Sequence, residues 1–125
     1  MSALPQAFLD AWDQHEPRMI LTTVNKASEP NAVWVLCVNK LDDKRILIAN
    51  NFFNKTLENI LAGSHGSLLM IAPEREAYQI KGALEYHTDG PIYNDMKAWL
   101  DPKFAGVGAV ILNIESIYYG AEKII

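Results

Sequence analysis

Three apolar segments rich in β-branched residues, separated only by short polar turns, limit the fold more than any other feature of the sequence. The segments cover residues 19–24, 32–39 and 45–49, and each has the length and composition of one strand. Strands joined by such short turns pair with one another, so we predict an antiparallel meander. Residues 32–39 are almost continuously apolar, which predicts a strand buried on both faces.

The remainder of the chain predicts three more strands and three short helices. The strands are expected at residues 67–72, 77–88 and 108–119. The helices are expected at residues 2–15, 55–62 and 91–100. Ser2 and Asn54 are the expected caps and Gly63 is a stop, while Gly82 marks a bulge or a barrel corner. These elements predict a mainly β fold, a six-stranded antiparallel barrel with two or three short helices, in one domain of residues 1–125.

Length and charge exclude several classes of protein. The chain has 125 residues, a formal net charge of -4 and no run of Lys and Arg, whereas a general nucleic-acid binder needs a basic face. No apolar run is long enough for a membrane span, and the N-terminus lacks the pattern of a secretion signal. The one cysteine, Cys37, is expected to be a small buried side chain. We therefore expect a cytoplasmic protein that binds neither nucleic acid nor membrane.

The sequence contains none of the common catalytic or metal-binding patterns. Its three histidines have no cysteine partner and no short His-x-x-His spacing, so no metal site is predicted. There is no Gly-x-Ser-x-Gly elbow and no Gly-x-Gly-x-x-Gly turn after a strand. His87 lies late in a predicted strand, where it either faces a ligand or is solvated. No catalytic residue is identified.

A polar corner between the third predicted strand and the following helix carries the one candidate ligand site. Asn54 can cap this helix with its side-chain oxygen, and Lys55 and Thr56 follow directly. The free N–H groups at a helix start attract anions, to which Lys55 adds a full charge and Thr56 a hydroxyl donor. The pattern predicts a phosphate site. Its plainer interpretation is a capped surface helix with a solvated lysine.

Two short signatures occur in the chain. One is Asn-Asn-Phe-Phe-Asn-Lys-Thr at residues 50–56, and the other is Ile-Lys-Gly at residues 80–82 followed by Thr-Asp-Gly-Pro at residues 88–91. Together they resemble the split-barrel flavin proteins of the pyridoxamine 5′-phosphate oxidase-like family, especially its small FMN-binding members. The resemblance implies a split β-barrel that forms a homodimer with two FMN molecules at the subunit interface. It also implies that Lys55 and Thr56 hold the FMN phosphate.

The same resemblance assigns the remaining FMN contacts. The second strand is expected to face the isoalloxazine ring, and the end of the third strand to meet the ring edge and the ribityl chain. The implied positions are Val33, Trp34 and Val35 on the second strand and Ile48, Ala49, Asn50 and Asn51 at the end of the third. By position alone, Trp99 and Phe104 are expected to reach the partner's flavin.

Departures from the family pattern limit the expected activity. The chain lacks the Arg-rich C-terminal segment that true pyridoxamine phosphate oxidases use on their substrate, and Arg75 is the only arginine after Arg45. Vitamin B6 oxidation is therefore not expected. A chain this small has little room for a substrate domain, which favours an FMN-dependent oxidoreductase or electron-transfer protein. The alternatives are a deazaflavin or haem cofactor in the same fold, and a non-enzymatic dimeric barrel.

Overall fold

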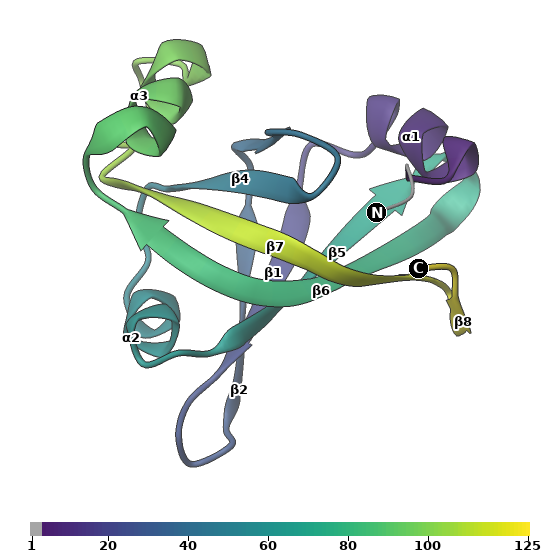
Figure 1. Cartoon of the computed structure of the whole chain (residues 1–125), viewed down its shortest axis with the longest axis horizontal. Helices are drawn as coiled ribbons and strands as arrows, with labels where there is room; N and C mark the ends of the chain where they lie inside the picture. The colour runs from purple at the N-terminus through teal and green to yellow at the C-terminus, as the bar shows by residue number, and fades with distance from the viewer. Residues whose placement is uncertain (1–3) are drawn as a thin grey trace.

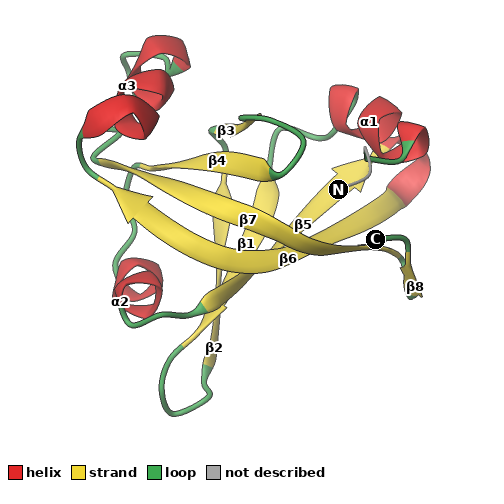
Figure 2. Ribbon diagram, viewed as in Figure 1, coloured by secondary structure: helices red, strands yellow, loops and turns green. Residues whose placement is uncertain are grey.

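The fold is one strongly curled antiparallel sheet with helices at its margins (Figure 1, Figure 2). A computed structural model describes residues 4–125. In that part of the chain the strands are β1 (Met19–Val24), β2 (Pro30–Val35), β3 (Val38–Lys40), β4 (Arg45–Asn50), β5 (His65–Ala72), β6 (Glu76–His87), β7 (Gly108–Tyr119) and β8 (Glu122–Lys123). The helices are α1 (Gln6–Asp13), α2 (Lys55–Leu61) and α3 (Gly90–Trp99), with a 3₁₀ turn at Pro73–Arg75. The predicted class, a mainly β antiparallel split barrel, is confirmed.

The segment predicted as the second strand breaks in two and lies at both edges of the sheet. The strand order is β2-β1-β5-β6-β7-β4-β3, with β8 added to β7. β2 pairs with β1, and β3 pairs with β4, so residues 30–40 cross from one edge to the other. The predicted pairing partners of this segment are therefore correct. The described residues form eight strands where six were predicted, because of this break and because of β8.

The predicted burial of residues 32–39 on both faces is wrong. β2 alternates between exposed and more covered positions, and Trp34 keeps 57% of its surface exposed. The physical reason is that β2 is an edge strand with one face toward the core and the other toward solvent. Val35 and Cys37 are buried, so the prediction made for the cysteine is correct.

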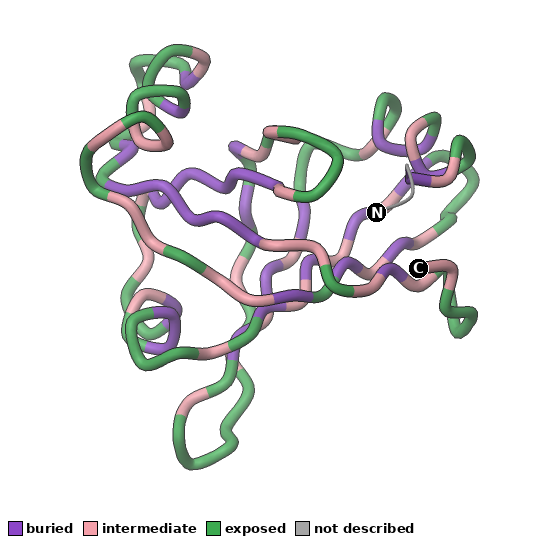
Figure 3. The backbone as a smooth tube through the Cα atoms, viewed as in Figure 1, coloured by how far each residue is buried: buried purple, intermediate pink, exposed green. Residues whose placement is uncertain are grey.

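The core divides into two clusters because β4 is buried on both faces (Figure 3). Ile46 and Ile48 belong to the main cluster, and Leu47 and Ala49 belong to a second cluster under α3. Successive side chains of a strand face opposite sides, which explains the division. Met96 of α3 is fully buried in the second cluster, and burying such a side chain contributes about 1.5–3 kcal/mol. Packing on both faces fixes β4 up to its last residue.

Gly82 lies at a bulge, as predicted. The register between β6 and β7 shifts between Lys81 and Gly82. A Cβ atom on Gly82 would lie 1.7 Å from the Asn113 carbonyl oxygen, a distance at which no side chain can be placed. The glycine is therefore required by the close approach of the neighbouring strand.

The helix starts differ from the predicted caps. Asn54 occupies the position before α2, but its side chain makes no capping hydrogen bond. Its backbone has φ of -130° and ψ of -84°, outside the extended conformation usual at a cap. The predicted cap at Ser2 lies outside the described residues, and α1 follows Pro5.

Candidate functional site

The polar corner lies where β4 ends and α2 begins, at the margin of the sheet (Figure 1). The buried residues of α2 are Thr56, Asn59 and Ile60. Residues spaced by three and four positions share one face of a helix, so this face packs toward the strands. Lys55, the first residue of α2, is exposed. The corner therefore combines a packed inner side with a charged outer side.

Two asparagine side chains bind the corner to other segments. The Asn50 amide donates to the Tyr86 hydroxyl at 2.8 Å, and its oxygen accepts the Phe53 N–H at 2.7 Å. The Asn51 oxygen accepts the Gly106 N–H at 2.9 Å, and its amide lies 3.5 Å from the sulfur of the one cysteine. Buried polar groups are nearly always paired in this way. Both side chains are thus committed to bonds within the protein.

Thr56 faces inward and ties α2 to β2. It is 1% exposed, and its oxygen accepts a hydrogen bond of 2.8 Å from the Asn31 amide. One turn later, the Asn59 amide donates to the Thr23 hydroxyl at 3.0 Å. The sequence pattern predicted that the Lys55 ammonium and the Thr56 hydroxyl hold the phosphate side by side. The structure separates them, with Thr56 in the interior and Lys55 in solvent.

Lys55 stands at a helix start that no side chain caps. None of the four side-chain ion pairs within residues 4–125 includes it. The N–H groups in the first turn of a helix have no partners within that helix. A full positive charge beside such donors attracts an anion, and the outer side of the corner has this arrangement.

Large apolar side chains are exposed around the corner. Phe52, three residues before α2, keeps 65% of its surface exposed. Val107 is also exposed, and its N–H donates to the carbonyl of the last residue of β4 at 2.9 Å. The Ala49 N–H donates to the Cys37 carbonyl at 2.9 Å, which brings Leu36 beside the end of β4. Trp34 lies two residues earlier in the same segment and is paired with β1. We call the four exposed residues the apolar rim: Trp34, Leu36, Phe52 and Val107. Exposed apolar side chains that form one patch mark binding surfaces.

The other predicted flavin contacts do not share one surface. Four of them are buried or half-buried in the core, namely Val33, Val35, Ile48 and Ala49. Trp34 faces solvent, because neighbours along a strand point to opposite sides. Trp99 and Phe104 pack against the second cluster under α3. Cavities of about 580 and 440 Å³ occur in this structure, and none of the predicted residues lines either one.

His87 is already paired with a carboxylate. Its Nε2 lies 3.1 Å from Glu85, and the Asn113 amide donates to the same carboxylate at 2.8 Å. The hydrogen bonds from Asn113 and His87 lower the pKa of Glu85, since both stabilise its charged form. Within residues 4–125 no group of three or more His, Cys, Asp or Glu is arranged to hold a metal ion. None of the helices in that range is long and apolar enough to span a membrane.

Sequence reasoning missed Asn31 and Tyr86, the two side chains that anchor the corner. Asn31 is separated from Thr56 by 25 positions and Tyr86 from Asn50 by 36, so no local pattern joins them. One feature of the sequence, Gly108, could have indicated the position of Tyr86. A Cβ atom there would lie 2.0 Å from the Tyr86 hydroxyl, and a glycine that opens a strand of large residues indicates such a close approach.

Comparison with known proteins gives matches over most of the chain. The family model described as pyridoxamine 5′-phosphate oxidase matches residues 5–119, which include the corner and the sheet through β7. The uncharacterized protein MJ0282 of Methanocaldococcus jannaschii is 33% identical over 105 residues, covering 80% of this chain and 70% of that protein.

Solved structures share the fold at lower identity. HupZ from Group A Streptococcus superposes with a TM-score of 0.79 at 23% identity, over 93% of each chain. An FMN-binding protein from Syntrophomonas wolfei subsp. wolfei gives a TM-score of 0.68 at 18% identity, over 82% of this chain and 76% of that one. At these identities the likeness concerns the fold alone.

Proposed function

The chain belongs to the pyridoxamine 5′-phosphate oxidase family, and we propose that it is an FMN-binding flavoprotein that acts in oxidoreduction or electron transfer. The observation that carries the proposal is the exposed Lys55 at the uncapped start of α2, bordered by the apolar rim. FMN has the two matching halves. Its phosphate needs a cation and N–H donors, and its planar ring needs apolar contact.

Each predicted residue takes a defined part in this proposal. Lys55 and the first N–H groups of α2 hold the phosphate. Thr56, which is buried, keeps the helix start in place through Asn31. Asn50 and Asn51 hold the end of β4 rigid beside the ribityl chain. Trp34, on the edge strand β2, offers its exposed indole ring to the flavin. The covered residues of β2 and β4 support it from the core: Val33, Val35, Ile48 and Ala49.

We propose that a second copy of the chain completes the site. In one chain the apolar rim and the edge strand β2 remain open to solvent. A homodimer that covers them would remove apolar surface from water and enclose the flavin ring. The family resemblance implies the same arrangement, with FMN at the interface. A cytoplasmic location remains a prediction from composition and belongs to this proposal.

The bound FMN supplies the electron-transfer chemistry, and the chain's own residues bind it and control access. Lys55 neutralises phosphate charge, and the apolar rim keeps water from the ring. Arg75 lies in the 3₁₀ turn before β6, at the opposite end of that strand from Tyr86. It therefore adds no second cation to the corner, and vitamin B6 oxidation forms no part of the proposal.

Absorption spectra and FMN titration test the cofactor. Purified protein should be yellow or should quench FMN fluorescence when titrated. Lys55→Ala should weaken FMN binding by about 1.5–3 kcal/mol, roughly 10- to 150-fold, because it removes the charge beside the phosphate. Lys123→Ala removes the same charge from the exposed strand β8 and should bind FMN like the parent chain.

Three results would contradict the choice of FMN as cofactor, and a fourth would contradict the role of Lys55. Colourless protein that leaves FMN fluorescence unchanged rejects the cofactor. A Soret band after reconstitution assigns haem, and selective uptake of a deazaflavin assigns that cofactor. Equal FMN affinity of Lys55→Ala and Lys123→Ala removes Lys55 from the phosphate role.

Sedimentation tests the proposed dimer separately. The parent chain should sediment at twice its mass of 14.0 kDa. Trp34→Asp should weaken the dimer by about 2 kcal/mol or more, because it places a charge where a large apolar anchor is buried. Val24→Asp changes an exposed apolar residue outside the rim and should leave the dimer intact. A parent chain that stays monomeric with FMN bound would reject the shared site.

A further inference from the structure

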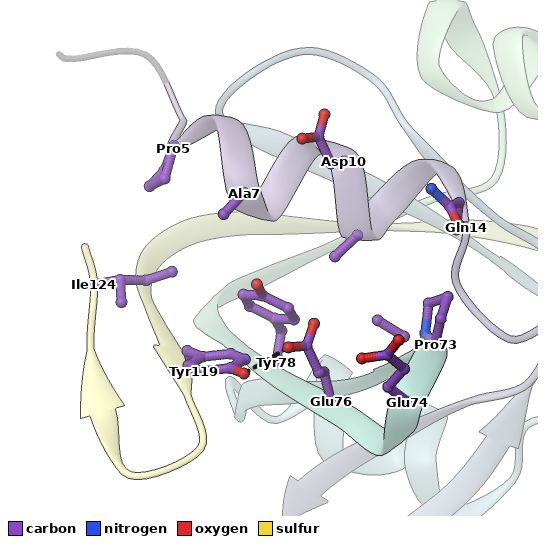
Figure 4. A pocket seen from close by; sticks show the side chains of 12 residues that line it. Pro5, Ala7, Asp10, Gln14, Pro73, Glu74, Glu76, Tyr78, Tyr119 and Ile124 are labelled. Carbon is purple, nitrogen blue, oxygen red and sulfur yellow. Dashed lines mark hydrogen bonds between the residues drawn. The ribbon is translucent and has the colours of Figure 1, made fainter.

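A cavity of about 580 Å³ lies between α1 and the first residues of β6 (Figure 4). α1 covers one side of it, with Ala7 and Ala11 among the lining residues, and the start of β6 and the end of β7 form the opposite side. Ile124 closes it near the C-terminus. No residue of the corner lines this cavity, so the proposed FMN site does not account for it.

The hydroxyl of Tyr78 opens into this cavity without a partner among residues 4–125. Tyr78 is only 4% exposed, and no side-chain hydrogen bond in that range involves its hydroxyl. Every fully enclosed side-chain N or O atom in that range has a hydrogen-bond partner. The Tyr78 oxygen has none, so part of its surface must be accessible, and Tyr78 lines the cavity. Figure 4 shows the hydroxyl directed toward α1. A buried hydroxyl is normally hydrogen-bonded, and this one is placed to bond a molecule in the cavity.

Two carboxylates face the same space. Glu76 accepts a hydrogen bond of 2.7 Å from the Tyr119 hydroxyl through Oε2, and its other oxygen remains open. The Glu74 side chain also points into the cavity (Figure 4). Asp10 adds a third acidic group from α1, although its carboxylate points away from the tyrosines and accepts a hydrogen bond from Gln6. The hydrogen bond from Tyr119 leaves Glu76 oriented for a second donor.

The lining has the chemistry of a cation site. It contains the three acidic residues and no Lys, Arg or His. The rings of Tyr78 and Tyr119 lie beside one another, with 5.0 Å between their centroids. Carboxylates bind ammonium groups through charge-assisted hydrogen bonds, and aromatic faces attract cations. We propose that the cavity binds a small organic cation of the primary amine class with an apolar body, whose ammonium group bonds Glu76 and the Tyr78 hydroxyl.

The protonation of the tyrosines agrees with this assignment. Burial and the negative charge of Glu76 raise the pKa of Tyr78, so its hydroxyl is neutral at pH 7 and its oxygen accepts an N–H. The hydrogen bond to Glu76 and its charge raise the pKa of Tyr119. An anionic ligand would meet the two carboxylates that face the cavity, Glu74 and Glu76, and a neutral ligand would leave them without a counter-charge.

Titration with matched probes tests the proposal. We would follow backbone amide NMR signals and calorimetry on addition of phenethylammonium, the neutral 2-phenylethanol and the anionic 3-phenylpropionate. Phenethylammonium should bind with a dissociation constant of about 0.1–1 mM, as a ligand of this size can reach, and should shift signals from residues 74–78. The alcohol should bind at least about tenfold more weakly, because it lacks the charge. The carboxylate should not bind.

Variants that keep the shape of the cavity test the Glu76 charge and the Tyr78 hydroxyl separately. Glu76→Gln should weaken phenethylammonium binding about tenfold or more, the effect of removing a charged partner, while Tyr78→Phe should weaken it about threefold or more by removing one neutral acceptor. Glu122→Gln removes an exposed carboxylate outside the cavity and should have no effect. Equal binding of all three probes, signal shifts confined to residues that do not line the cavity, or unchanged affinity of Glu76→Gln overturns the proposal. FMN titration of the same variants should match the parent chain, so the two proposals fail independently.

Discussion

The corner at the start of α2 and the cavity under α1 present their binding groups in opposite ways. The corner exposes a lysine and an apolar rim, and its residues line neither cavity of the structure. The cavity is a formed hollow with an acidic lining, built from three segments far apart in the chain: residues 5–14, 72–78 and 119–124. The corner can be recognised as a motif in one stretch of sequence. The cavity exists only because the topology brings its parts together.

β6 connects the two regions through one continuous strand. Glu76 and Tyr78 at its start line the cavity, and Tyr86 near its end anchors the corner. Gly82 lies between them, at the bulge against β7. If the two sites depend on the same strand geometry, a change at the bulge should damage both, whereas changes at either end should stay local.

Gly82→Ala tests this shared dependence and should have the largest effect. The added Cβ would lie 1.7 Å from a backbone oxygen of β7, which cannot move as a side chain can. We expect a loss of about 3 kcal/mol or more in the free energy of unfolding, at the upper end for overpacking, together with loss of FMN and amine binding. Gly120→Ala has open space around it at φ of 57° and should cost only about 1–2 kcal/mol of backbone strain. Denaturant unfolding measures the stability of both variants. If Gly82→Ala and Gly120→Ala lose equal amounts of unfolding free energy, the bulge does not support the two sites.

Asn50→Ala should damage the corner alone. The change leaves the Phe53 N–H and the Tyr86 hydroxyl without their partner, at a cost of about 1–3 kcal/mol. Asn54→Ala provides the matched control, because the Asn54 amide makes no capping hydrogen bond and its loss should stay within about 0.5 kcal/mol. Amine binding in the cavity should persist in both variants. Loss of amine binding in Asn50→Ala would show that the two regions are coupled through β6.

The sequence predicted what is set by local pattern. β-branched segments indicated most of the strands, and Gly82 indicated the bulge, because strand propensity and the absence of a side chain act at the residue itself. The break in residues 32–39 was not predictable in this way. It depends on curvature of the whole sheet, which brings β2 and β3 to opposite edges. The exposure of Trp34 follows from that edge position.

The candidate site was predictable in part for the same reason. Lys55 and Thr56 were identified from a helix start, and local geometry does place them there. Their opposite orientations depend on Asn31, which reaches Thr56 from a strand 25 positions away. The cavity had no sequence signal at all, since the pattern predicts Tyr78 as an ordinary strand residue and places Glu76 in the turn before that strand, and only α1 makes them part of a cavity.

Thr56→Val sharpens the division of roles within the corner. The change keeps the shape and removes the acceptor of the Asn31 amide, so we expect a loss of about 1 kcal/mol in stability. If Thr56 acts only as an anchor, FMN affinity should fall far less than in Lys55→Ala. Thr88→Val changes an exposed threonine and should leave both quantities unchanged. A strong loss of FMN affinity at unchanged stability would place the hydroxyl against the phosphate.

Alkaline titration of the tyrosines gives the smallest effect and concerns the cavity. The hydrogen bond to Glu76 and its charge raise the pKa of Tyr119 above its ordinary value of 10.0, and burial followed by the Glu76 charge raises that of Tyr78. Because the folded values are raised, this contribution to stability is present below pH 10 and is lost as pH rises through the folded values. Tyrosinate absorbance should show two of the five tyrosines titrating late. Glu76→Gln should lower the pKa of Tyr119 toward its ordinary value and that of Tyr78 by less, because burial is the larger cause for Tyr78. Glu122→Gln should change neither, and an unchanged Tyr119 titration in Glu76→Gln would mean that Glu76 does not govern the charge inside the cavity.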